Sequence, residues 1–200
     1  MKGYYFITDS ALSLAGNYSD VKSAVSAGVE AVQYRHKNAS SKEMYEEARK
    51  LRGLCQNTAF LVNDRVDIAL SVEADGVHLG QDDIPYALAR KLLGKKKIIG
   101  LTVHTLKEAQ EAQRLGADYL GVSPIFGTRT KSDAGKPAGL ELIRKIRKAV
   151  RIPIIAIGGI NLKNAGAVVQ AGADGLCAIS AVITQPDVKK EIIGFQQLFR

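Results

Sequence analysis

One short phrase recurs four times along the chain, each time where a helical pattern gives way to an apolar strand. The copies occupy residues 27–32, 72–77, 115–120 and 171–176. In three of them a glycine suits a left-handed helix stop, and in all four an acid precedes the apolar run. Asp75 and Asp118 lie 43 residues apart, which is room for two strand–helix units. A period of about 21 residues therefore predicts a repeated βα unit.

The other strand and helix patterns fit this repeat. Short continuous apolar runs, typical of strands buried on both faces, cover residues 4–8, 31–35, 60–63, 76–80, 98–102, 119–123, 153–158 and 175–180. Helical patterns lie near 19–27, 40–56, 64–71, 84–93, 105–115, 139–149, 161–171 and 187–198. Eight such units in 200 residues predict an α/β fold, a compact (β/α)8 TIM barrel. An open doubly wound sheet is the alternative, but eight even repeats favour closure.

Composition bounds the class of protein. The 46% hydrophobic content supports one substantial core, and no linker divides the chain, so we expect a single domain over 1–200. Apolar runs fall far short of the ~20 residues that span a bilayer, and the N-terminus is unlike a signal peptide. We therefore expect no membrane association and a cytoplasmic location.

Charge and cysteine content exclude two further classes of function. The net charge is +8, but the basic residues are spread along helices without interleaved aromatic residues, so we expect no nucleic-acid partner. Cys55 and Cys177 have no CxxC partner or nearby histidine, so we expect two reduced core thiols and no zinc site.

In a barrel of this kind the active site lies at the carboxyl ends of the strands. The second strand ends in Gln33, Arg35 and Lys37, which alternation places on one side, toward the barrel mouth. Two cations in this position suggest a bound anion, since without one they would be costly to bury. An ion pair of Arg35 with Asp64 is the alternative.

Acidic residues follow the third and fourth strands. Asn63 and Asp64 end one, and Asp83 follows the other, on the same rim of a parallel sheet. Carboxylates near basic side chains suggest Mg²⁺ that holds a phosphate or diphosphate. Helix capping could explain each acid singly, but it does not explain their convergence with Arg35 and Lys37. Asp82 is expected to be a turn or cap residue.

A second anion site is expected across the rim. Residues 124–138, after the sixth strand, form an irregular stretch of the length of an active-site loop, and Thr128, Thr130 and Lys131 within it suit a phosphate. Gly158 and Gly159 open the seventh helix, where exposed backbone N–H groups can bind phosphate. His78 is expected in the core, and His104 is more often structural than catalytic in such a position.

These motifs together resemble the thiamine phosphate synthase family. The resemblance rests on residues 33–37, 63–65, 76–83, 124–131 and 158–160, in order and in spacing over nearly the whole chain. It implies that a hydroxymethylpyrimidine diphosphate joins a hydroxyethylthiazole phosphate, giving thiamine phosphate and pyrophosphate. The implied chemistry is dissociative: the bond to diphosphate breaks first, and the thiazole nitrogen attacks the resulting pyrimidine cation.

The resemblance also implies roles for particular positions. The pyrimidine diphosphate would contact Gln33, Arg35, Lys37, Asn63 and Lys131, with Thr102 as a pyrimidine contact, and Arg35, Lys37 and Lys131 would be catalytic. Mg²⁺ would bind Asp64 and Asp83. The thiazole phosphate would contact Thr128, Thr130, Gly159, Ile179 and Ser180.

Two alternatives share the fold. One is a thiazole tautomerase, a relative in which the catalytic histidine stands where this chain has Pro124; the other is a non-catalytic regulator that binds thiamine precursors. Pro124 cannot transfer protons, and the full set of metal and phosphate residues is present, so the synthase is favoured. The sequence leaves a homo-oligomer open.

Overall fold

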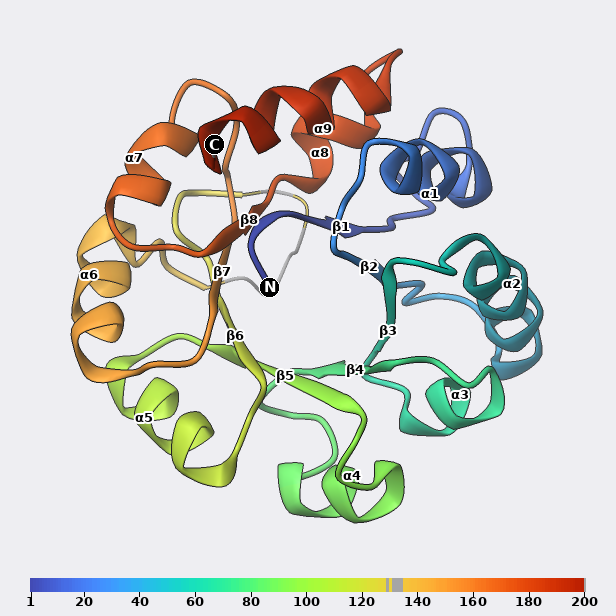
Figure 1. Cartoon of the computed structure of the whole chain (residues 1–200), viewed down its shortest axis with the longest axis horizontal. Helices are drawn as coiled ribbons and strands as arrows, with labels where there is room; N and C mark the ends of the chain where they lie inside the picture. The colour runs from blue at the N-terminus through green and yellow to red at the C-terminus, as the bar shows by residue number, and fades with distance from the viewer. Residues whose placement is uncertain (129, 131–134, 200) are drawn as a thin grey trace.

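Eight parallel strands form a closed barrel (Figure 1). The computed structural model describes residues 1–128, 130 and 135–199. The strands are β1 (Gly3–Ile7), β2 (Ala31–Tyr34), β3 (Ala59–Asn63), β4 (Gly76–Leu79), β5 (Ile98–Val103), β6 (Tyr119–Val122), β7 (Ile154–Ile157) and β8 (Gly175–Cys177). Each pairs with the next in chain order, and β8 pairs with β1. The predicted (β/α)8 barrel is confirmed.

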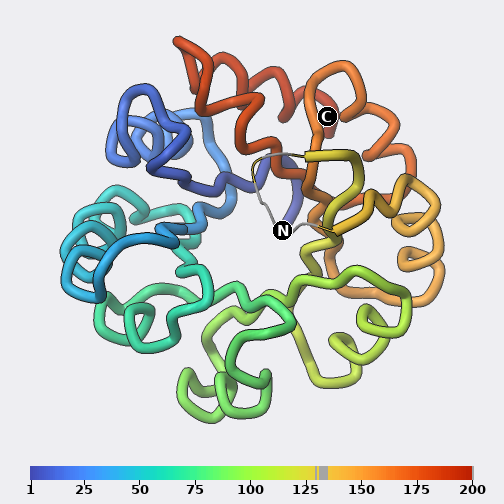
Figure 2. The backbone as a smooth tube through the Cα atoms, turned by 180° about the vertical axis from the view of Figure 1, so that it is seen from behind, coloured from blue at the N-terminus to red at the C-terminus, as the bar shows by residue number. Residues whose placement is uncertain are grey.

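Helices surround the barrel on all sides (Figure 1). They are α1 (Asn17–Ser26), α2 (Ser41–Leu54), α3 (Val66–Ser71), α4 (Tyr86–Leu93), α5 (Leu106–Leu115), α6 (Gly139–Ala149), α7 (Ala165–Gln170), α8 (Ile179–Ile183), α9 (Val188–Gln196) and the 3-10 turn η1 (Gln197–Phe199). Viewed from behind, the N-terminus lies near the barrel axis and the C-terminus among the outer helices (Figure 2). No helix in these described ranges has the length and apolar character needed to cross a membrane.

One strand prediction was wrong at its end. The apolar run 175–180 was expected to be strand throughout, but β8 ends at Cys177 and α8 begins at Ile179. A short apolar run does not by itself distinguish strand from buried helix. Here Val182 and Ile183 continue the run and are fully buried as helical residues against the core.

Strand alternation divides the hydrophobic residues into two cores. Side chains such as Phe6, Val32 and Leu120 face outward and pack under the helices in the larger cluster. Side chains such as Tyr5 and Leu61 face inward and form a smaller cluster inside the barrel. The inner cluster fills the barrel interior beneath the polar residues at the carboxyl ends of the strands.

The repeated phrase has one structural role at the opposite, amino end of the strands. Asp118, in the turn before β6, accepts a hydrogen bond from the backbone N–H of Ile99 at 2.7 Å and pairs with Arg90 of α4, also at 2.7 Å. We call this arrangement the turn clamp. Among the described residues it occurs three times, with the residue sets Asp75, Phe60 and Arg52; Asp118, Ile99 and Arg90; and Asp174, Ile154 and Arg147.

Glycines inside the barrel make room for two large side chains. A Cβ at Gly100 would lie 2.1 Å from Cζ of Tyr119, and one at Gly121 would lie 2.8 Å from Cε1 of His78. Such separations are far below van der Waals contact, and the Tyr119 ring is fully buried. These two glycines therefore determine that Tyr119 and His78 can occupy the barrel interior.

Replacing Gly100 tests this packing. Gly100→Ala should destabilise the protein by about 2 kcal/mol or more, because the buried Tyr119 ring must shift to admit the methyl group. Gly53→Ala, in α2 with nothing within 4 Å of the added Cβ, should be neutral or stabilising by about 0.5–1 kcal/mol. Urea denaturation midpoints measure both, and equal midpoints for the two variants would contradict the packing account.

Candidate active site

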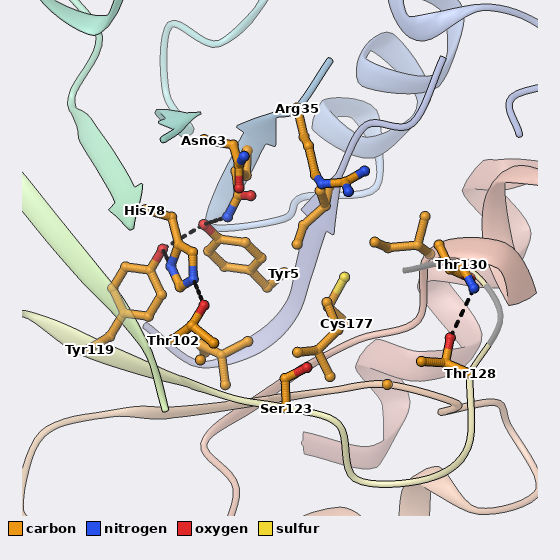
Figure 3. Close-up of a pocket in the computed structure, with 17 residues that line it drawn as sticks. Tyr5, Arg35, Asn63, His78, Thr102, Tyr119, Ser123, Thr128, Thr130 and Cys177 are labelled. Atoms are coloured by element: carbon orange, nitrogen blue, oxygen red, sulfur yellow. Dashed lines mark hydrogen bonds between the residues drawn. The ribbon is translucent and has the colours of Figure 1, made fainter. Parts of the chain in front are cut away.

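A pocket of about 100 Å³ opens at the carboxyl ends of the strands, and all eight strands contribute side chains at its floor or wall (Figure 3). Of the residues predicted for the site, those that line it are Gln33, Arg35, Asn63, Thr102, Thr128, Thr130 and Ile179. Within the described residues, Lys37, Asp64 and Asp83 lie at the neighbouring β2–β4 rim and not in this lining. The fold therefore gathers residues from far apart in the sequence at one end of the barrel.

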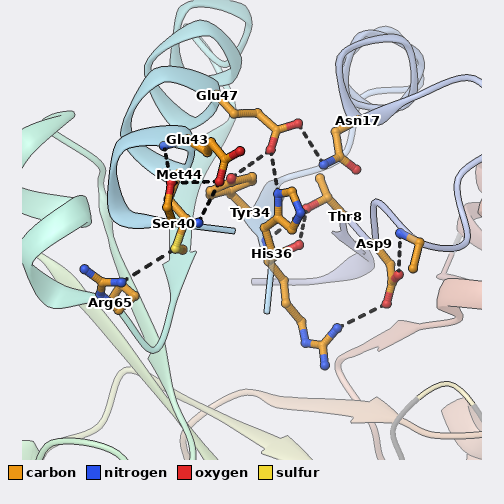
Figure 4. Close-up of polar contacts among 12 residues, drawn as sticks. Thr8, Asp9, Asn17, Tyr34, His36, Ser40, Glu43, Met44, Glu47 and Arg65 are labelled. Atoms are coloured by element: carbon orange, nitrogen blue, oxygen red, sulfur yellow. Dashed lines mark hydrogen bonds and ion pairs between the residues drawn. The ribbon is translucent and has the colours of Figure 1, made fainter. Parts of the chain in front are cut away.

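An ion pair and a backbone hydrogen bond position Arg35 just after the end of β2. Its Nη1 donates to Oδ2 of Asp9 at 3.1 Å, and its backbone N–H donates to the Thr8 hydroxyl at 2.9 Å. Figure 4 labels the two partners, Asp9 and Thr8. The Asp9 carboxylate is fixed in turn, because its Oδ1 accepts from the N–H of Ala11. The predicted alternative, a pair of Arg35 with Asp64, is not formed.

Sequence reasoning missed Asp9. It follows β1 as Asp64 follows β3, so the same attention to acids after strands could have found it. Asp9 is only 8% exposed, and an acid this buried is normally paired.

Asp64 pairs instead with Lys37. The Lys37 ammonium donates to Oδ2 of Asp64 at 2.6 Å, and Oδ2 of Asp83 accepts from the backbone N–H of Gly80, also at 2.6 Å. The two carboxyl groups lie close enough for each to shift the pKa of the other. Asp64 has a φ of 61°, a left-handed conformation that is uncommon for a residue with a side chain but that Asp and Asn tolerate best. Strain of this kind concentrates at functional sites.

The pKa values of Asp64 and Asp83 shift in opposite directions, in part because the two carboxyl groups interact with each other. Burial opposes ionisation of Asp64, but hydrogen bonds with Asp83 and Lys37 outweigh it, so the pKa of Asp64 is lowered. Burial and the bond with Asp64 raise the pKa of Asp83, although the Gly80 N–H offsets part of this. Two neighbouring carboxyl groups oppose each other's ionisation, and a bound cation would favour the ionised form of both.

A chain of hydrogen bonds crosses the pocket floor (Figure 3). Gln33 Nε2 donates to the Tyr5 hydroxyl at 2.9 Å, which bonds the Tyr119 hydroxyl at 2.7 Å. The Tyr119 hydroxyl bonds Nδ1 of His78, and His78 Nε2 bonds the Thr102 hydroxyl, each at 2.8 Å. We call these five residues the floor chain.

His78 was expected in the hydrophobic core, and this was wrong. It alternates with Val77 and Leu79, which face the helices, so its ring faces the pocket. Strand alternation alone could have placed it there. Tyr5 and Tyr119 were also missed, because their apolar neighbours gave no sign of a polar partner. His104 is exposed, outside the described pocket lining, and its Nδ1 bonds the Ser123 carbonyl.

The loops after β6 and β7 pack closely at the opposite rim. Ile125 and Phe126 donate backbone N–H groups to the carbonyls of Ile157 and Gly158, both at 3.0 Å. Gly159 has a φ of 62°, and a Cβ there would lie 2.4 Å from the Gly127 carbonyl oxygen, so this approach requires glycine. The Thr130 N–H donates to the Thr128 hydroxyl at 3.2 Å. The predicted Lys131 lies outside the described residues.

Residues after β8 lie beside these loops in the fold. Ile179 lines the pocket, while Ser180 is exposed in the first turn of α8. Cys55 and Cys177 are buried free thiols, as predicted. Cys177 also lines the pocket, and burial raises the pKa of its thiol, which disfavours a nucleophilic role.

Comparison with known proteins agrees with this architecture. The family model described as thiamine monophosphate synthase matches residues 4–182. The thiamine-phosphate synthase of Methanosarcina barkeri is 54% identical over 198 residues, which are 98% of this chain and 90% of the relative. The enzyme of the same name from Chloroflexus aurantiacus is 53% identical over 187 residues, covering 92% and 86% of the two chains.

A solved structure extends the likeness to the fold. The thiamine phosphate pyrophosphorylase of Pyrococcus furiosus superposes with a TM-score of 0.90 at 43% identity, covering 98% of this chain and 94% of that one. The family match spans both rims of the pocket, and the sequence identity extends over nearly the whole barrel. The chain therefore belongs to the thiamine monophosphate synthase family, and it is a transferase of thiamine biosynthesis.

Proposed function

We propose that the two rims of the pocket bind the two substrates of the family reaction, a hydroxymethylpyrimidine diphosphate and a hydroxyethylthiazole phosphate. The observation that carries this proposal is the meeting of Arg35, Lys37, Asp64 and Asp83 at one rim. Cations beside a close pair of acids are suited to a diphosphate that brings its own metal ion. A site for an uncharged ligand would not require this concentration of charged side chains.

The diphosphate site uses the ends of β2 and β3. Arg35 offers a planar guanidinium that Asp9 holds in place while Thr8 bonds its backbone, and Lys37 offers an ammonium on a half-exposed side chain. Asn63 lines the pocket beside them. Lys131 is proposed to join this group from the loop. Each cation stabilises negative charge that grows on the diphosphate as its bond to the pyrimidine carbon breaks.

The residues present fit Mg²⁺. Asp64 and Asp83 provide hard oxygen ligands, and the raised pKa of Asp83 beside Asp64 indicates a place where positive charge would be favourable. Among the described residues no group of three or more His, Cys, Asp or Glu side chains is placed to hold a metal. Two carboxylates suffice for Mg²⁺, which commonly completes its ligands with water and substrate phosphate. When bound, Mg²⁺ supplies further charge stabilisation to the leaving diphosphate.

The thiazole phosphate is assigned to the opposite rim. Thr128 and Thr130 can donate hydroxyl hydrogens, and Ile179 and Ser180 can present backbone N–H groups in the first turn of α8. Gly159 was expected to open a helix, but α7 begins only at Ala165, so its N–H would be presented from the bend that follows β7. The thiazole nitrogen would then face the pyrimidine carbon across the pocket. Positioning of the two reactants, with charge stabilisation of the leaving group, accounts for the reaction without a covalent intermediate on the protein.

Pyrophosphate release tests the proposal directly. The folded protein, supplied with both precursors and Mg²⁺, should release pyrophosphate and form thiamine phosphate, and either precursor alone should give neither product. A thiazole tautomerase would act on its single phosphorylated ligand without pyrophosphate release. A regulator would bind the precursors without turnover. Either result would overturn the assignment.

Asp64→Asn tests the metal role. Asn tolerates the left-handed backbone at this position, so the change removes charge without added strain. Activity should fall at least ~100-fold and recover in part at higher Mg²⁺, because the remaining carboxylate binds the ion weakly. Asp82→Asn is the matched control, since Asp82 is exposed in the same turn as Asp83, and it should retain full activity. Unchanged activity of Asp64→Asn across Mg²⁺ concentrations would refute the metal role.

Asp9→Asn tests whether Asp9 positions Arg35. Loss of the ion pair frees the guanidinium, so KM for the pyrimidine diphosphate should rise about tenfold, equivalent to ~1.4 kcal/mol. KM for the thiazole phosphate should not change. Asp67→Asn, which removes an exposed pair with Arg65, controls for loss of an acid elsewhere. A lower KM in Asp9→Asn would show instead that the Asp9 charge weakens the anion site.

A further inference from the structure

The floor chain joins two proposed substrate contacts that lie on different strands. Gln33 of β2 is at one end and Thr102 of β5 is at the other, with Tyr5, Tyr119 and His78 between them (Figure 3). Gln33, Tyr5 and Tyr119 are each at most 3% exposed. Polar groups this buried are normally retained only when hydrogen-bonded, and a complete chain can fix one arrangement of its members.

Packing holds the chain in place. The ring centroids of Tyr119 lie 5.6 Å from Tyr5 and 5.4 Å from His78. Gly100 and Gly121 face Tyr119 and His78 at distances that leave no room for a side chain in their place. Burial raises the pKa of both tyrosines, so each hydroxyl keeps its hydrogen and can donate it once.

The single hydrogen of each hydroxyl gives the chain a direction. Since the Gln33 amide donates to Tyr5, one arrangement gives both buried hydroxyl hydrogens an acceptor: Tyr5 donates to Tyr119, and Tyr119 donates to Nδ1 of His78. In this arrangement Nδ1 of His78 carries no hydrogen, and Nε2 donates to Thr102. This leaves the amide oxygen of Gln33 as an acceptor and the hydroxyl hydrogen of Thr102 as a donor.

We propose that Tyr119 and His78 are positioning residues that couple Gln33 to Thr102, so that the pocket recognises a ring edge with an amine beside an unprotonated ring nitrogen. This edge occurs in the aminopyrimidine half of thiamine. The inference rests on the proposed function, which makes Gln33 and Thr102 pyrimidine contacts. The amine donates to the Gln33 oxygen, and the ring nitrogen accepts from the Thr102 hydroxyl.

Because the five residues of the floor chain are coupled, discrimination between ligands depends on all of them together. An oxo analogue, with a carbonyl in place of the amine and a hydrogen on the ring nitrogen, presents the reversed pattern. Binding it requires the Gln33 amide to rotate, and every hydrogen bond of the floor chain must then reverse, including the tautomer of His78. A break in the middle of the chain removes this requirement, because the Gln33 amide can rotate without changing His78 or Thr102.

Calorimetric binding with Mg²⁺ tests this on the aminopyrimidine diphosphate and its oxo analogue. The unmodified protein should prefer the amine by ~100-fold or more. Tyr119→Phe should bind the amine about tenfold more weakly and reduce the preference at least tenfold, with thiazole phosphate binding unchanged. Tyr34→Phe is the matched control: Tyr34 is a fully buried tyrosine of β2 whose hydroxyl bonds Glu47 on the helix side. It should keep the preference.

A spectroscopic readout measures the tautomer of His78 in the unmodified protein. In protein labelled with ¹⁵N-histidine, His78 should show protonated Nε2 and unprotonated Nδ1, and loss of that signal in His78→Gln assigns it among the three histidines. The opposite tautomer, or an unchanged preference in folded Tyr119→Phe, would overturn the inference. Tight, selective binding without pyrophosphate release would count against the proposed function and leave the floor chain supported.

Discussion

The turn clamps tie three strands of the barrel to their neighbours and to helices at the amino ends, opposite the active-site rim. In each clamp one aspartate accepts a backbone N–H from the first or second residue of a strand and pairs with an arginine of the helix that precedes that strand. The clamp fixes a strand, its neighbour and a helix through one carboxylate. Because these contacts lie at the far end of the strands from the pocket, the carboxyl ends are free to carry charged, strained and polar residues that would weaken a scaffold built only from them.

The amount of this structure that could be predicted from sequence varied with the kind of signal. The repeated phrase gave the barrel correctly, because its glycine and acid mark each turn before an apolar strand. The rim residues Arg35, Lys37 and Asp64 could be placed together from strand order. Their actual partners could not, since Arg35 could reach either Asp9 or Asp64 and only the folded geometry decides. The end of β8 was misread because an apolar run of this length is compatible with strand and helix alike.

The interior of the barrel shows why the polar contacts of a pocket floor are difficult to predict from sequence. Tyr5 and Tyr119 read as ordinary apolar strand residues, and His78 as a buried one. Their hydroxyl and ring nitrogens meet only because eight strands close on themselves and because Gly100 and Gly121 leave space. The result is a polar line through an otherwise hydrophobic centre, beneath a rim where the charges are concentrated. Recognition of the flat ring and stabilisation of the departing charge are thus assigned to different depths of the same pocket.

The left-handed backbone at Asp64 has a consequence for how this enzyme can change over evolutionary time. Asp and Asn adopt that conformation more readily than other residues with a side chain. Glutamate can adopt it, since Glu73 of this chain has a φ of 53°, but at position 64 it would carry its carboxylate further from the chain than aspartate does. Exchange of Asp64 for Glu, often harmless on a surface, is therefore disfavoured by backbone conformation and by side-chain length together. These two restrictions act on the choice of residue in addition to any requirement of the chemistry.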